Sequence, residues 1–127
     1  MNETRYFVVV FGDPEPDRDH VESGTYTAEH GYPPFEAEPG DMLLLYCTSA
    51  YARYPMQVPG IGKVTSATRA EIRYEWRQLP RPILRPTILA GFEPEDRQKM
   101  KQLRFNVRRV FQISAASFSH VVDQARG

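Results

Sequence analysis

The chain has 127 residues, of which 41% are hydrophobic and 25% are charged, and its formal net charge is zero. This length predicts one domain, residues 1–127, with a single core, and the proportions are ordinary for a soluble globular protein. The longest apolar run, residues 6–11, is far too short to span a membrane.

Two features predict a cytoplasmic protein with no membrane partner. The first residues, Met1 to Arg5, lack the apolar core that a secretory signal peptide needs. Cys47 is the single cysteine, which rules out an internal disulfide and fits a reducing compartment.

The charges are distributed unevenly along the chain. Residues 1–41 carry ten acidic and two basic side chains, a net charge of −8, and the remaining residues therefore carry +8. Such asymmetry is a hint of contact with nucleic acid or a membrane. The alternative is that the acidic and basic segments face each other in the fold and cancel.

The first half of the chain predicts three strands. Residues 6–11 are a continuous β-branched and aromatic run, typical of a central strand buried on both faces. A long acidic connector, residues 13–41, follows, and a loop of this length is usually functional or mobile. Residues 42–47 form the second strand, and residues 59–64 open a third, whose glycines permit tight bends or close backbone approach.

The second half begins with the clearest strand. In residues 72–77, apolar and charged side chains alternate, so one face is core and the other is wet. Pro80, Pro82 and Pro86 are expected to break the structure that follows.

Two short helices and a fifth strand are expected after the prolines. Residues 93–96 begin a helix, with proline at the first turn and acids at the positive end of the helix dipole. Residues 107–113 form the strand, and Ser114 caps a last helix. The apolar residues of that helix recur at helical spacing: Phe118, Val121, Val122 and Ala125.

Strands joined by irregular connections, with only two short helices, do not suggest alternating β-α units. The sequence predicts an α+β fold, a small and mostly antiparallel β-barrel of about five to six strands with peripheral helices.

Four segments occur in an order shared with a known family. They are Tyr6–Val10, Gly40–Ser49, the Pro-Gly-Ile-Gly-Lys-Val run of residues 59–64, and Arg109–Ser114 followed by Phe118. Together they resemble the EVE domain, a member of the PUA-like superfamily. The resemblance implies a PUA-like barrel that binds DNA or RNA without catalysis and reads a modified or flipped base in a pocket.

A base pocket needs an aromatic wall, short polar groups for the base edge, and cations for the flanking phosphates. The resemblance implies that the pocket side chains converge on one hollow: Tyr6, Tyr46, Cys47, Thr48 and Ser49. The expected phosphate-binding cations are Arg53, Lys63, Arg73, Arg77, Arg108 and Arg109. Tyr51 and Tyr54, on either side of Arg53, are placed to close the loop over a ligand.

Each of these residues also has a purely structural interpretation. Tyr46 suits a core position, and Cys47 suits a small buried hydrophobe. Arg73 and Arg77 suit the solvated face of an ordinary strand.

Patterns typical of enzymes are missing from the sequence. His20, His30 and His120 are isolated and do not have zinc-ligand spacing, and prolines interrupt the acids of residues 13–19, which spoils a calcium loop. There is no P-loop, dinucleotide fingerprint or nucleophile elbow. The sequence therefore predicts no catalysis, no metal and no cofactor.

A second function fits the same fold. The acidic connector would repel phosphate if it covered the pocket, which would favour a protein-interaction or regulatory module, or a binder of a free nucleotide-like metabolite.

Overall fold

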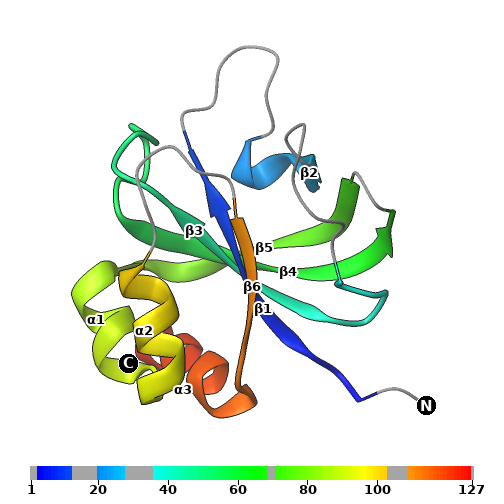
Figure 1. Ribbon diagram of the computed structural model, residues 1–127. Helices are drawn as coiled ribbons and strands as arrows, with labels where there is room; N and C mark the ends of the chain where they lie inside the picture. The colour runs from blue at the N-terminus through cyan, green and yellow to red at the C-terminus, as the bar shows by residue number, and fades with distance from the viewer. Residues whose placement is uncertain (1–2, 13–19, 28–35, 69–70, 103–108, 127) are drawn as a thin grey trace.

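Six strands form one curled, mixed sheet with the shape of half a barrel (Figure 1). The structure, a computed structural model, describes residues 3–12, 20–27, 36–68, 71–102 and 109–126. The strand order is β2-β5-β4-β3-β1-β6. The strands are β1 (Tyr6–Phe11), β2 (Thr25–Thr27), β3 (Met42–Cys47), β4 (Gln57–Ala67), β5 (Glu71–Leu84) and β6 (Arg109–Ile113), and the helices are η1 (Val21–Ser23), α1 (Arg85–Gly91), α2 (Pro94–Lys101) and α3 (Ala115–Arg126).

β1 is the central strand that the sequence predicts. It pairs in parallel with β3 and antiparallel with β6, and five of its six residues are buried. β3 matches its predicted bounds, and four of the five described strand pairings are antiparallel. The predicted α+β class and the mostly antiparallel, barrel-like sheet are thus confirmed, although the described strands form half of a barrel.

Alternating side chains give the sheet two cores. The inner core lies within the curl and includes Phe7, Val9, Leu43, Leu45, Cys47, Tyr51 and Tyr74. The outer core lies between the convex face and the helices and includes Val8, Val10, Leu44, Tyr46, Leu79, Ile88 and Phe118. Because side chains on a strand alternate, successive residues of β1 and β3 feed opposite cores.

The glycines of β4 allow aromatic rings to lie directly on its backbone. A Cβ at Gly60 would lie 2.5 Å from the Trp76 ring, and a Cβ at Gly62 would lie 2.6 Å from the Tyr74 ring. The predicted close backbone approach is therefore present, and it lets the two rings of β5 fill the inside of the curl.

The turn before β3 is held by one carboxylate. Asp41 is buried, and its two oxygens accept the backbone N–H groups of Arg5 and Glu38 at 3.0 and 2.8 Å. Gly40 precedes it with φ of +95°, a conformation that favours glycine. The Gly-Asp pair of the family-like motif thus has a structural role in this chain.

The expectation that prolines end the fourth strand is wrong. β5 continues through Pro80 and Pro82 to Leu84. The register with β4 shifts between Gln78 and Ile83, so the two prolines lie where no regular ladder hydrogen bond is required. Pro86 occupies the first turn of α1, a helix that the sequence analysis did not anticipate.

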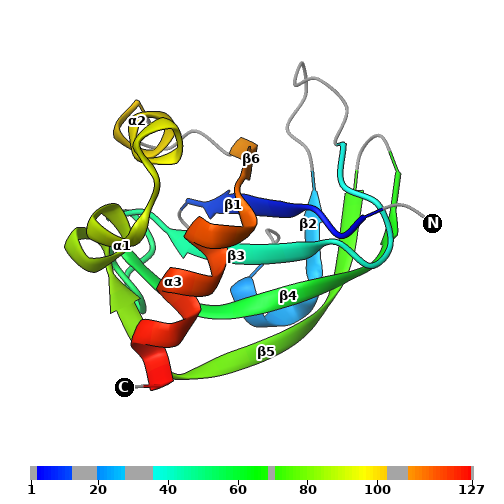
Figure 2. The ribbon, with the colours of Figure 1, turned by 90° about the horizontal axis from the view of Figure 1, so that it is seen from below.

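The last two helices agree with their predicted signals. α2 begins at Pro94 with acidic residues in its first turn, and the Ser117 N–H donates to Ser114 Oγ at the start of α3. The predicted apolar residues of α3 are buried: Phe118, Val121, Val122 and Ala125. In Figure 2, α3 crosses one half of the convex face and leaves the other half, with the start of β5, uncovered.

Candidate nucleic-acid interface

The two tyrosines expected to form the walls of a pocket lie on the same face but apart. Tyr6 is opposite Met42 in the register, whereas Tyr46 is opposite Val10. Four residues of strand separate these positions, about 13 Å at the usual rise. Tyr6 is half-buried with its ring 4.8 Å from that of Phe118, and Tyr46 is 2% exposed in the outer core. Tyr6 therefore remains accessible, and Tyr46 is enclosed.

The other three predicted pocket residues do not converge on Tyr46. Cys47 points to the inner core and is fully buried. Thr48 is also buried, and its Oγ1 accepts the Ala50 N–H at 3.3 Å, whereas Ser49 is exposed. Because neighbouring residues of a strand face opposite sides, Tyr46 and Cys47 cannot line one hollow.

A guanidinium group does reach Tyr46, and it comes from Arg85, which is not one of the predicted site residues. Arg85 Nη1 donates to Tyr46 Oη at 3.1 Å, and Nη2 donates to the Met100 carbonyl at 3.1 Å. No local pattern signals this contact, because residues 46 and 85 lie on separate elements. The Tyr46 hydroxyl is engaged in the fold.

The loop after β3 is tied to the acidic connector. Tyr51 is buried, and its Oη accepts the Val21 N–H at 3.1 Å. Arg53 is exposed, lies over the ring of Tyr54 and forms an ion pair with Glu22, with Nη1 and Oε1 3.3 Å apart. The predicted phosphate ligand Arg53 thus has an acidic partner already.

Three other predicted cations, Lys63, Arg73 and Arg77, are exposed on the convex face of β4 and β5. Arg73 Nε donates to Glu71 Oε1 at 2.7 Å, and this hydrogen bond raises the pKa of Arg73. Within the described residues, Lys63 and Arg77 have no ion-pair partner within 4 Å.

The side chains of the last two predicted cations, Arg108 and Arg109, are not among those that the structure describes. Arg108 lies outside the described residues, and of Arg109 the structure describes the backbone, opposite Val10 in the β1–β6 pairing.

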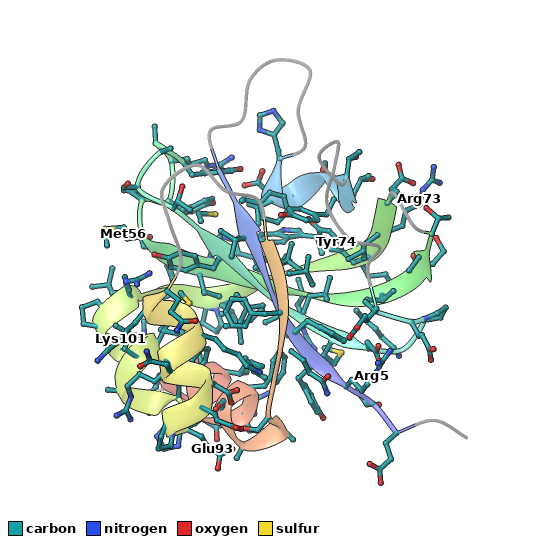
Figure 3. All side chains as sticks on the ribbon, viewed as in Figure 1. Arg5, Met56, Arg73, Tyr74, Glu93 and Lys101 are labelled. Atoms are coloured by element: carbon teal, nitrogen blue, oxygen red, sulfur yellow. The ribbon has the colours of Figure 1, made fainter. Side chains whose placement is uncertain are left out.

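These positions define a surface, here called the open face, that the described residues leave partly or fully exposed: Tyr6, Met42, Lys63, Arg73, Glu75 and Arg77. Met42 stands between Tyr6 and Lys63 in the register, so these three side chains form one row across β1, β3 and β4. Arg77 lies opposite Ile61, one row further along. Figure 3 shows Arg73 at the end of the sheet away from the helices. The open face thus combines one partly exposed aromatic ring with two cations, Lys63 and Arg77, that have no acidic partner among the described residues.

A depression of about 480 Å³ lies elsewhere, where the first turns of α2 and α3 meet β6. Its floor holds the buried Asp96, whose Oδ2 accepts the Ser117 hydroxyl at 2.7 Å and the Ser114 N–H at 3.0 Å. The Lys99 ammonium on its rim donates to the Gln112 carbonyl. These polar groups are satisfied by one another, which indicates a role in holding the helices together.

No protein-family model matches the chain, and no curated protein matches it in sequence. In the described part of the chain, no set of three or more His, Cys, Asp and Glu side chains is placed to hold a metal ion. Among the same residues, no helix is long and apolar enough to cross a membrane.

Proposed function

We propose that this chain is a non-enzymatic domain that binds nucleic acid through its open face. The observation that carries the proposal is the combination of Lys63 and Arg77, exposed and without an acidic partner among the described residues, with the half-buried ring of Tyr6 on the same face. Cations bind phosphates, and an accessible aromatic ring stacks on an unpaired base.

The proposal retains the EVE-like, PUA-like identity suggested by the four sequence segments, with action in the cytoplasm. The accessible aromatic ring favours single-stranded nucleic acid or a base flipped from a duplex, because a paired and stacked base offers no free ring face. Of the aromatic residues predicted to contact the base, the proposal keeps Tyr6 alone. Tyr46 and Cys47, at the end of β3, are enclosed on opposite faces of the sheet.

The charge of the open face sets the expected strength of binding. Lys63 and Arg77 supply two phosphate contacts, because Arg73 is paired with Glu71 and Glu75 adds a negative charge. Two contacts to a single strand correspond to a slope of about −1.4 in log affinity against log salt. Binding is thus expected to be clear at low salt and to weaken steadily as salt is added.

Fluorescence anisotropy with labelled single- and double-stranded oligonucleotides at several salt concentrations tests the proposal. Lys63→Gln and Arg77→Gln should each weaken binding and reduce the slope by about 0.7. Lys101→Gln, which removes an exposed cation at the end of α2, is the matched control and should bind like the unaltered protein. No binding to either oligonucleotide at low salt would refute the proposal.

The alternative is a protein-interaction module on the same fold. The ion pairs of Arg53 with Glu22 and of Arg73 with Glu71 favour it, because they leave less positive charge for phosphate. It predicts that the charge variants of the open face do not change oligonucleotide binding.

A further inference from the structure

Two buried tyrosines hold the 3-10 turn η1 in a fixed position over the loop that follows β3. Tyr51 Oη accepts the Val21 N–H at 3.1 Å, and Tyr74 Oη donates to the Val21 carbonyl at 2.6 Å. The backbone of Val21 is thus fixed from both sides. Glu22, the next residue, projects from this fixed point toward Arg53.

The Glu22 carboxylate is partly buried beside the loop that follows β3. Its Oε1 is buried and accepts no hydrogen bond from the described residues, although Arg53 Nη1 lies 3.3 Å away. Burial raises the pKa values of Cys47 and Tyr51, and the nearby Glu22 charge adds to both rises. The carboxylate is therefore close enough for its charge to act on these two side chains, and Arg53 is its ionic partner.

Arg53 has the exposure and setting of a ligand-binding cation. Its side chain is 69% exposed, and its guanidinium carbon lies 5.2 Å from the centre of the Tyr54 ring. A guanidinium beside an aromatic ring is suited to a phosphate and its attached base. Paired with Glu22, however, it presents no net charge to an approaching anion.

We propose that the Glu22–Arg53 ion pair is an autoinhibitory contact, in which Glu22 of the acidic connector occupies the place of a phosphate on Arg53. The inference rests on the proposed function, because the ligand that it excludes is a nucleic-acid phosphate. Arg53 is not part of the open face, since it follows the end of β3 whereas Met42 stands at its start, so this phosphate would be an additional contact to the same bound strand. While Glu22 is charged, a phosphate has to displace it or be repelled by it. Arg53 therefore contributes to binding after Glu22 has been neutralised or displaced.

The test is a double-mutant cycle measured by anisotropy with a labelled single-stranded oligonucleotide at low salt. Glu22→Gln keeps the shape of the side chain and removes its charge, and it should tighten binding about two- to five-fold, the range expected for releasing an exposed ion pair. Freeing one more phosphate contact should also steepen the salt slope by about 0.7. Glu95→Gln removes an exposed acid of α2 and is the control for overall charge.

Arg53→Gln separates a local contact from a diffuse effect of charge. It should change binding little in the unaltered protein and should abolish the gain in the Glu22→Gln background. Tighter binding of Glu22→Gln that survives loss of Arg53, or that Glu95→Gln reproduces, would overturn the inference and leave the proposed function standing. Failure of every variant to bind would overturn both.

Discussion

Arg85 in α1 donates a hydrogen bond to the end of α2, and Arg97 in α2 donates two to the end of α1. Arg85 in α1 reaches the Met100 carbonyl in the last turn of α2. Arg97 in α2 reaches the carbonyls of Leu89 and Phe92, at the end of α1, at 2.8 and 3.0 Å. The last carbonyls of a helix lack partners within it, and a cation at this end also complements the helix dipole.

This reciprocal arrangement makes Arg97 a stability determinant. Arg97→Ala should lower the free energy of unfolding by about 2 kcal/mol, because two carbonyls lose a charged donor. Urea unfolding followed by circular dichroism measures the change. Lys101→Ala, one turn further along α2 and exposed, should change the unfolding free energy by less than about 0.5 kcal/mol. Equal effects of the two substitutions would contradict the proposed role of Arg97.

The same kind of contact uses several cations of the basic half of the sequence within the fold. Arg85, Arg97 and Lys99 donate to backbone carbonyls of the helices and of β6. Arg53 is paired with Glu22, so at this point the acidic and basic segments do face each other. Net charge by segment cannot separate these structural cations from exposed ones such as Lys63, which has no acidic partner among the described residues.

Strong local patterns allowed much of the fold to be predicted. The continuous apolar run of β1 predicts a strand buried on both faces, and the alternation at the start of β5 predicts a strand buried on one face. Both predictions agree with the burial in the structure. Ser114 was predictable as a cap, because it immediately precedes an amphipathic run.

Features that depend on distant partners were not predictable. β2 has three residues, and it forms because it pairs with the start of β5, where Thr25 lies opposite Arg73. The path of β5 through Pro80 depends on the register shift against β4. The separation of Tyr46 from Tyr6 depends on the parallel pairing of β1 with β3, which no local pattern specifies.

The buried thiol of Cys47 predicts a loss of stability in alkali. Burial, with a smaller effect of Glu22, raises the pKa of Cys47 well above its ordinary value of about 8.5. Above about pH 8.5 the unfolded chain loses the thiol proton, whereas the folded chain keeps it. The unfolded state is therefore increasingly favoured as pH rises. The unfolding free energy should fall by about 1.2 kcal/mol between pH 9 and 10 from this group.

Urea unfolding of the unaltered protein and of Cys47→Ala, each at pH 7, 9 and 10, measures this dependence. The variant should be less stable at pH 7, because a buried side chain is truncated, but it should lack the thiol's part of the alkaline slope. Parallel pH profiles of the two proteins would show that the thiol ionises equally in both states.

Tyr6 and Tyr46 provide the sharpest test of where a base is bound. Tyr6→Leu removes the ring from the open face but keeps an apolar side chain against Phe118, and it should weaken single-strand binding about 5- to 100-fold, the usual range for one stacked base. Tyr46→Leu removes an enclosed ring and the hydroxyl that Arg85 contacts, and it should leave the affinity of the folded protein unchanged. Anisotropy and urea unfolding on the same samples separate the two effects, since Tyr46→Leu should cost more stability than Tyr6→Leu. If Tyr46→Leu instead weakened binding in a protein that remains folded, the base would be bound at the end of β3, and the open face would not be the site.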